Sequence, residues 1–179
     1  FGMVPQDRVQ RVAAYVQSRG MTCSVYGAQF LLDALYLAGR DEAALRLMAG
    51  KGRRSWYNML RMGSTITAEA WDNVYKSNLD WNHAWGAAAA NVIARRLMGI
   101  RPLKPGFEEI AICPQPGGLS HARIVQPSPR GSIGVEWRTR SDGKLNLSVT
   151  VPANSTARLT LPHTGQVVTL PPGHHRISE

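Results

Sequence analysis

The apolar residues of this chain change their spacing once, close to residue 100. Before that point they recur every three or four positions, which is typical of amphipathic helices, and after it they alternate with polar residues, which is typical of strands. Pro102, Pro105 and Gly106 stand at the change and would end a helix there. The sequence therefore predicts a mixed fold, with a helical part over residues 1–103 and an all-β part over residues 104–179.

Five helices are expected in the first part, at residues 7–18, 26–37, 41–48, 56–61 and 84–98. Phe30 and Leu37 fall on the apolar face of the second helix, and Asp41 is expected to cap the third. The linker Gly39-Arg40 is so short that the second and third helices must form an antiparallel hairpin.

These helices lack partners within the chain. Helical hairpins are stable when layers on either side bury their apolar faces, so this part looks like an arc cut from a larger ring. We therefore expect the chain, which begins at Phe1, to be a piece of a longer protein. Its exposed helical face is expected to promote self-association.

Seven strands are expected in the second part, at residues 108–113, 122–126, 131–139, 144–151, 156–161, 166–170 and 175–178. Ser141-Asp142-Gly143 predicts a tight hairpin between two of them. Strands of this length and spacing indicate an antiparallel β-sandwich. Trp137 shares a strand face with Val135, so we expect its indole in the core.

The formal charge of +9 raises the question of an anionic partner. Lysines and arginines are scattered, and no basic stripe with interleaved aromatic residues occurs, so a solvated surface is favoured over nucleic-acid binding. No run approaches the roughly 20 apolar residues of a membrane span, so no membrane partner is expected. The sequence leaves the cellular compartment undetermined.

The cysteines and histidines show no spacing typical of a metal site. Cys23 and Cys113 lie far apart and are expected to be free thiols. The paired residues His174 and His175 would point to opposite faces of a strand. We therefore predict no metal and no cofactor.

The segment between Gly63 and Asn82 has no periodicity but is dense in aromatic and acidic residues. Flat aromatic faces pack on pyranose rings, carboxylates bind sugar hydroxyls, and one carboxylate can act as acid or base. The set comprises Glu69, Trp71, Asp72, Tyr75, Asp80 and Trp81, followed by His83 and Trp85. This composition suits carbohydrate chemistry.

The order of these residues resembles that in the family 78 glycoside hydrolases, the α-L-rhamnosidases. That family carries a G-x-T-x-x-x-E-x-W-D motif, which residues 63–72, GSTITAEAWD, resemble, and an N-H-x-x-G motif, which residues 82–86, NHAWG, resemble. Shorter similarities extend the match over most of residues 24–162. The resemblance implies the last hairpins of an (α/α)6 barrel, followed by the C-terminal β-sandwich.

The resemblance also implies roles. Family members are inverting enzymes, in which a general base activates water. By motif, Glu69 matches the proposed general base and His83 a histidine that lines the rhamnose pocket. The family's general acid belongs to earlier barrel loops, so this chain would hold only half of the site and be inactive in isolation. A rhamnose-containing glycan or glycoside is the implied substrate.

Other residues of the segment are candidates for substrate binding. Trp71, Trp81 and Asp72 are assigned to it, whereas Trp85, which lies in a predicted helix beside alanines, is expected in the core. Each has a structural alternative: Asp72 could pair with Lys76 or Arg61. In the same way, Glu69 could be only a salt-bridged loop carboxylate and His83 a satisfied core residue.

Two alternatives stay open. Ala68 stands where many family members have an aromatic residue, so the substrate could be another deoxysugar or a uronic acid. The β-sandwich could instead be a non-catalytic carbohydrate-binding or structural module, although Trp137, its main candidate aromatic, is expected to be buried.

Overall fold

The computed structural model describes residues 3–179. The chain divides into two compact units, one ending at Val92 and the other running from Ile93 to Glu179. None of the helices in the described residues is both long and apolar enough to cross a membrane.

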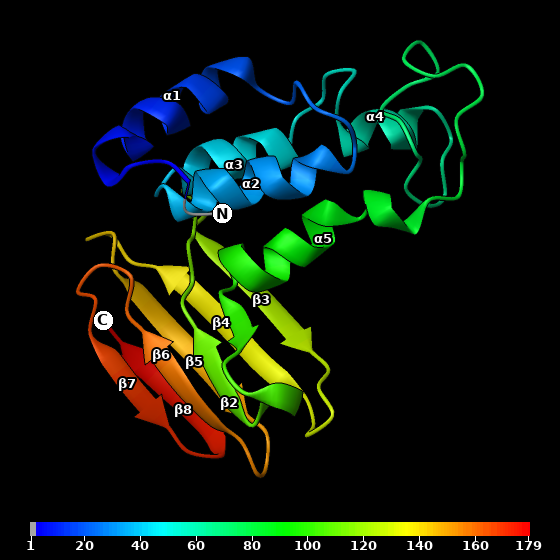
Figure 1. Cartoon of the computed structure of the whole chain (residues 1–179). Coiled ribbons are helices and arrows are strands. Elements are labelled where there is room, and N and C mark those ends of the chain that lie inside the picture. Colours follow the sequence, from blue (N-terminus) through cyan, green and yellow to red (C-terminus); the bar gives the residue numbers. More distant parts are fainter. Residues whose placement is uncertain (1–2) are drawn as a thin grey trace. The chain divides into compact units, whose positions relative to one another are not determined.

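The first unit is helical (Figure 1). Its helix α2 packs against α1, α3 and α5. The elements are the 3-10 turn η1 (Gln6–Arg8), α1 (Val9–Arg19), α2 (Gly27–Leu37), α3 (Asp41–Met48), α4 (Trp56–Arg61), the 3-10 turn η2 (Ala84–Gly86) and α5 (Ala88–Val92).

The first four predicted helices are present, with three corrections in this unit. Asp41 is the first residue of α3 and not its cap; the capping position is Arg40, whose side chain makes no capping hydrogen bond. Phe30 and Leu37 are exposed, because the buried face of α2 consists of Ala28, Leu32, Leu35 and Tyr36.

The third correction concerns residues 84–98, which do not form one helix. The segment divides into η2, which ends at Gly86, then α5, which contains the alanine run, and the π-helical turn η3 (Ile93–Leu97). Gly86 itself lies so close to the loop before it that a Cβ added there would be 2.8 Å from Cβ of Thr67.

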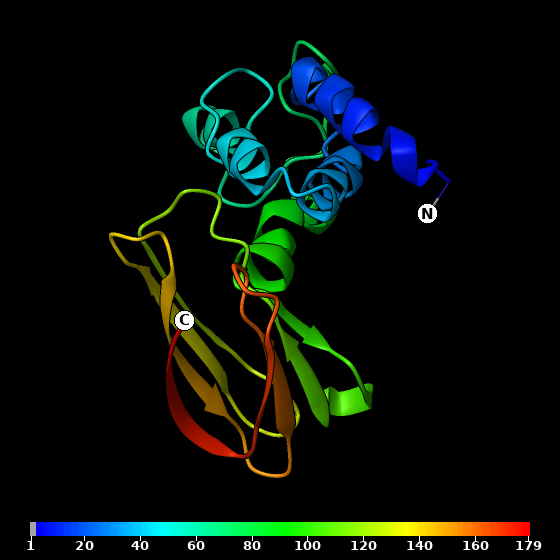
Figure 2. The same ribbon diagram turned by 90° about the vertical axis from the view of Figure 1, so that its left-hand side faces the viewer.

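The second unit is built from two four-stranded sheets, which Figure 2 shows from the side. One sheet has the order β1-β2-β6-β7 and the other β3-β4-β5-β8. The strands are β1 (Ile100–Pro102), β2 (Glu109–Ile112), β3 (His121–Gln126), β4 (Ile133–Thr139), β5 (Leu145–Val151), β6 (Thr156–Thr160), β7 (Val167–Leu170) and β8 (Gly173–Ser178). The short 3-10 turn η4 (Pro105–Phe107) connects β1 to β2.

All seven predicted strands are present, but the expectation of a purely antiparallel sandwich is wrong. Strands β2 and β6 pair in parallel, with Glu109 opposite Thr156. Strand β1 is not predicted from the sequence, because Pro102 indicates a break in regular structure. β1 is the edge strand of its sheet, and a proline is tolerated there since no neighbour needs its missing N–H.

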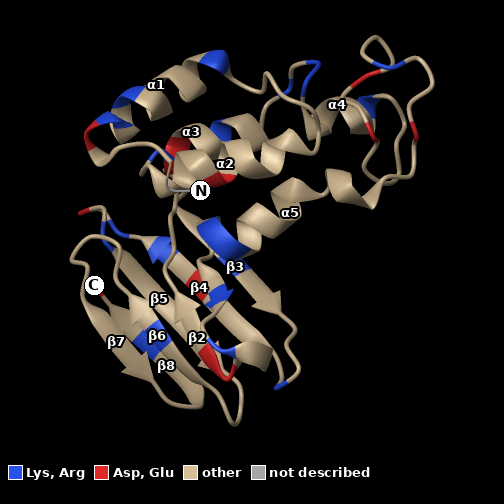
Figure 3. Ribbon diagram, viewed as in Figure 1, with Lys and Arg blue, Asp and Glu red and all other residues tan. Residues whose placement is uncertain are grey.

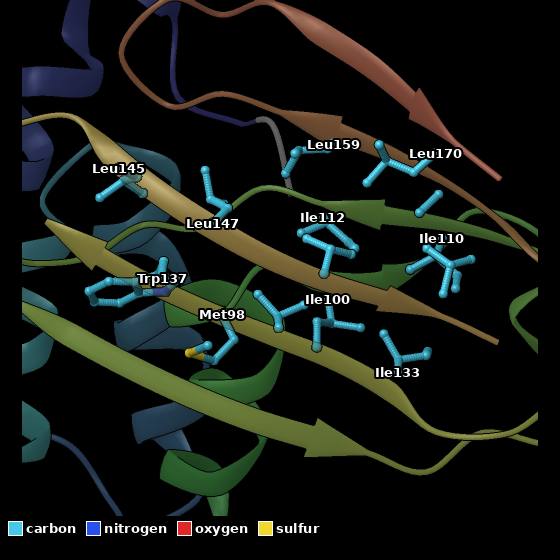
Figure 4. Close-up of a cluster of buried hydrophobic side chains, with 14 of the residues drawn as sticks. Met98, Ile100, Ile110, Ile112, Ile133, Trp137, Leu145, Leu147, Leu159 and Leu170 are labelled. Carbon is cyan, nitrogen blue, oxygen red and sulfur yellow. The ribbon is translucent and has the colours of Figure 1, made fainter. Parts of the chain in front are cut away.

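Alternating side chains of both sheets form the core between them (Figure 4). Along β5, Leu145, Leu147 and Val149 are buried while the residues between them face outward. Trp137 on β4 is fully buried, which confirms the expectation from its shared face with Val135. Met98 and Ile100 enter this core from the start of the unit.

The turn into β1 depends on a glycine. Gly99 has a φ of +77°, and a Cβ added to it would lie 2.1 Å from the carbonyl carbon of Cys113. The two backbones therefore touch at this point, and the Cys113 N–H donates to the carbonyl of Gly99 at 3.1 Å. A larger residue would force them apart, which explains why the helical segment ends here with glycine.

Candidate functional site

The aromatic and acidic segment lies in the loop between α4 and η2, where residues 62–83 contain no helix or strand. Ser55 caps α4: its hydroxyl accepts from the N–H of Asn58 at 3.1 Å and donates to the carbonyl of Gly52 at 2.6 Å. The buried Asn58 amide then donates to the carbonyl of Trp71 and to Asp72 Oδ2, both at 2.9 Å. The start of α4 thus anchors the middle of the loop.

Backbone contacts bring the two ends of the loop together. Glu69 N–H donates to the carbonyl of Asp80 at 2.8 Å, and His83 N–H donates to that of Thr67 at 2.8 Å. The Thr67 hydroxyl donates a hydrogen bond to the carbonyl of His83 at 2.7 Å. These bonds place the two predicted motifs, around Glu69 and His83, side by side.

Both oxygens of the Glu69 carboxylate are held. Lys76 Nζ lies 2.5 Å from Oε1, and the N–H of Asp80 donates to Oε2 at 3.1 Å. The hydrogen bond from Lys76, followed by that from Asp80, lowers the pKa of the Glu69 carboxyl below its ordinary value. Glu69 is therefore an ionised, oriented carboxylate, and its side chain remains 23% exposed.

His83 lies in an aromatic cluster beside that carboxylate. Its ring centroid is 5.3 Å from that of Tyr26 and 5.4 Å from that of Trp85. His83 Nδ1 is 3.5 Å from Oδ2 of Asp80. A partly exposed imidazole with a carboxylate beside it can donate to a sugar hydroxyl.

Trp71 is 3% exposed, with its indole N–H donating to the carbonyl of Cys23 at 2.8 Å. Its ring meets Trp56 edge to face, with centroids 5.0 Å apart. Such a ring forms a rigid wall and leaves little of its face open for stacking.

Asp72 is mostly covered and accepts from the N–H of Val74 as well as from Asn58. These two bonds, in that order, lower the pKa of the Asp72 carboxyl. Its nearest cation is Arg53, at 3.9 Å, whereas Lys76, one of the partners considered for Asp72, binds Glu69.

Two tryptophans are open to solvent in this chain. Trp81 is 42% exposed and Trp85 is 79% exposed. The expectation that Trp85 belongs to the core is wrong. Trp85 lies in the three-residue turn η2, and its exposed indole meets the rings of Tyr26 and His83 at interplanar angles of 73° and 79°.

A hollow of about 480 Å³ opens beside Glu69. Of the predicted site residues, Glu69 and Trp71 line it, whereas Asp72, Trp81 and His83 do not. Sequence reasoning missed three of the residues that do: Tyr26, Arg54 and Lys76. Tyr26 and Arg54 are distant in sequence from the motif, and no periodicity links them to it. The full lining is Cys23, Ser24, Val25, Tyr26, Arg54, Glu69, Ala70, Trp71, Tyr75 and Lys76.

The other groups considered are possible metal ligands, the two cysteines and the basic side chains. Among residues 3–179, no group of three His, Cys, Asp or Glu side chains could hold a metal ion. Cys23 and Cys113 are free, and burial raises the pKa of both thiols. Lysines and arginines are spread over helices, strands and loops (Figure 3).

Two family models match the chain. Residues 1–97 match the bacterial alpha-L-rhamnosidase 6 hairpin glycosidase domain, and residues 99–175 match the bacterial alpha-L-rhamnosidase C-terminal domain. Among curated proteins, an alpha-L-rhamnosidase of Alteromonas sp. is 29% identical over 192 residues, covering 99% of this chain and 20% of the relative. One of Streptomyces avermitilis is 29% identical over 163 residues, covering 85% of this chain and 16% of the relative. The chain thus spans about a fifth, or less, of the length of these relatives.

Solved structures show the same fold. The alpha-L-rhamnosidase of Aspergillus terreus superposes with a TM-score of 0.84 at 22% identity, covering 97% of this chain and 21% of that one. That of Streptomyces avermitilis, complexed with L-rhamnose, gives a TM-score of 0.81 at 24% identity, covering 98% and 20%. The GH78 family rhamnosidase of Bacillus sp. GL1 gives 0.73 at 28% identity, covering 90% and 18%.

Proposed function

This chain belongs to the bacterial α-L-rhamnosidase family, and from that membership we propose that it is the C-terminal part of a glycoside hydrolase that removes α-L-rhamnose from glycans or glycosides. The observation that carries the proposal is Glu69: an ionised carboxylate in the family's motif, fixed at both oxygens, at the wall of a hollow beside Trp71.

We assign the helical unit to the last hairpins of an (α/α)6 barrel. Several large side chains of this unit are exposed, among them Tyr15, Phe30, Leu37 and Leu60. The earlier hairpins of a complete barrel would cover such side chains. In the isolated chain the same surface would favour self-association.

Glu69 is proposed as the general base of an inverting reaction. An ionised carboxylate can take a proton from water as that water attacks the anomeric carbon. The acid that protonates the leaving oxygen would come from an earlier part of the protein, roughly 6.5–9.5 Å from the base. This chain then contributes half of the catalytic pair and does not hydrolyse substrate alone.

The remaining candidates take supporting roles in the proposal. His83 and the exposed indole of Trp81 contact the sugar, and the covered ring of Trp71 forms the wall behind it. Asp72 acts chiefly through Asn58, with which it fixes the loop, and offers its remaining lone pairs to the substrate.

The alternative, a β-sandwich that binds carbohydrate without cleavage, has less support. Its main candidate aromatic, Trp137, is fully buried between the sheets and offers no face to a sugar. The β-unit is better assigned a structural role in the complete protein.

The proposal is tested with the full-length protein and 4-nitrophenyl α-L-rhamnoside, with proton NMR recording the first anomer released. We expect hydrolysis that yields β-L-rhamnose first, since water attacks from the face opposite the leaving group. The 179-residue chain alone is expected to show none. Initial release of the α-anomer would rule out the inverting mechanism, and an active isolated chain would rule out the half-site.

Lys76 is expected to set the acid limb of the pH profile. Its hydrogen bond is the largest cause of the lowered pKa of Glu69, so Lys76→Met raises that pKa. The active form of a base is the deprotonated one, so the acid limb of kcat/KM should move to higher pH while the rate at neutral pH changes little. The profile is measured on full-length protein with the aryl rhamnoside. Lys104→Met, which breaks a Lys–Glu pair in the β-unit, is the control. An acid limb at the same pH in Lys76→Met would show that Lys76 does not lower the pKa of the general base.

A further inference from the structure

The hollow beside Glu69 contains one cation, Arg54, that has no counter-charge in the part of the chain that the structure describes. Three of its lining residues carry charge: Arg54, Glu69 and Lys76. Lys76 and Glu69 lie 2.5 Å apart and neutralise each other. Arg54 has no carboxylate within ion-pair distance among residues 3–179, whereas its neighbour Arg53 lies 3.9 Å from Asp72. The hollow therefore keeps a net positive charge.

The Arg54 guanidinium is held in place by an aromatic ring. Its central carbon lies 4.6 Å from the ring centroid of Tyr75, and the side chain is half-buried. The backbone beside it is fixed by the buried cap residue Ser55. An arginine that stacks through its face keeps its edge N–H groups available, and these match the two oxygens of a carboxylate.

The other walls of the hollow supply no anion. Burial raises the pKa of the Cys23 thiol above its ordinary value, so the sulfur stays protonated at neutral pH. The pKa of the Tyr26 hydroxyl is also raised, mainly by burial and then by the charge of Glu69. Among residues 3–179, the one carboxylate of the hollow is already paired with Lys76, so the carboxylate of a ligand would complement Arg54.

We propose that Arg54 forms a subsite for the carboxylate of a uronic acid joined to the rhamnose that is cleaved. The inference rests on the proposed function, because it takes Glu69 to mark the cleavage point in the same hollow. The substrate class would then be acidic rather than neutral rhamnosides, with Arg54 determining that specificity and taking no part in the chemical step.

The test compares three substrates of the full-length protein: a rhamnosyl glucuronate, its methyl ester, and 4-nitrophenyl α-L-rhamnoside. The ester has nearly the same shape without the charge. We expect wild-type kcat/KM to favour the glucuronate over the ester by about 10- to 100-fold, as for a hydrogen bond between charged groups. Arg54→Gln should remove most of this preference, mainly through KM, and leave the aryl rhamnoside unchanged.

Two further variants sharpen the result. Arg54→Lys keeps the charge but loses the planar fork, so it should retain only part of the preference. Lys51→Gln removes a similar cation–ring contact, 5.6 Å from the Tyr57 ring and outside the hollow, and should behave as wild type. An equal loss with all three substrates in Arg54→Gln would mean a structural role and overturn the proposal, as would a wild-type enzyme that does not distinguish acid from ester.

A binding measurement separates this inference from the proposed function. Calorimetric titration of the full-length protein with glucuronate and with its methyl ester requires no turnover. Binding of glucuronate but not of its methyl ester, with loss of that binding in Arg54→Gln, would support the subsite. This result would stand even if the protein hydrolysed no rhamnoside, and then only the proposed function would fail. Equal binding of both, or of neither, would overturn the subsite whatever the hydrolysis shows.

Discussion

Replacing Glu69 with glutamine in the full-length protein is expected to lower kcat for 4-nitrophenyl α-L-rhamnoside by a factor of about 10² or more, with KM changed little. The amide has nearly the shape of the carboxylate but cannot accept the proton of the attacking water. Its one carbonyl oxygen can still accept the backbone hydrogen bond from Asp80, whereas the hydrogen bond from Lys76 is lost because the amide NH2 is a donor.

The control is Glu108→Gln, which neutralises an exposed carboxylate paired with Lys104 in the β-unit. It is expected to leave kcat unchanged. Circular dichroism of both variants establishes that they are folded. Unchanged hydrolysis in Glu69→Gln would remove this carboxylate from the mechanism and place the base outside the chain.

Replacing Trp137 with alanine is expected to lower the free energy of unfolding of the β-unit by about 3–5 kcal/mol. The indole is fully buried between the two sheets, so its removal loses apolar burial and leaves a cavity that the strands around it can fill only in part. Urea unfolding of the 179-residue chain, followed by far-ultraviolet circular dichroism, measures the change.

Trp85→Ala is the matched control, because it deletes the same side chain from a site that is 79% exposed. Its effect on unfolding should stay within about 0.5 kcal/mol. Similar losses in the two variants would contradict the assignment of Trp137 to the core.

Much of the fold could be predicted from local patterns. The alternation of apolar and polar residues predicts seven of the strands and the inward face of β4, because every second side chain of a strand points to the same side of the sheet. Partner choice could not be predicted: nothing in the local pattern of β2 distinguishes a parallel neighbour from an antiparallel one. The predicted inward face of α2 is wrong in part. Apolar residues lie on both faces of that helix, so the neighbouring helices decide which face is buried.

The site divides in the same way. The motifs predict Glu69 and His83 as site residues, and the backbone and Thr67 hydrogen bonds of the loop bring their two segments together. The groups that tune and flank the carboxylate, Lys76 and Arg54, could not be predicted, because irregular loops have no period from which contacts follow. The pattern misplaces Trp85, because it predicts one continuous helix where the structure has the short turn η2.

The parallel pairing of β2 with β6 affects how the β-unit is made. Strand β2 leaves the ribosome well before β6, and until then one of its edges has only water as a hydrogen-bonding partner. A contact so distant in sequence slows folding, and an open strand edge can pair with another chain. A nascent chain that stops between the two strands would therefore expose an unpaired edge of β2, which could pair with another chain until β6 is made.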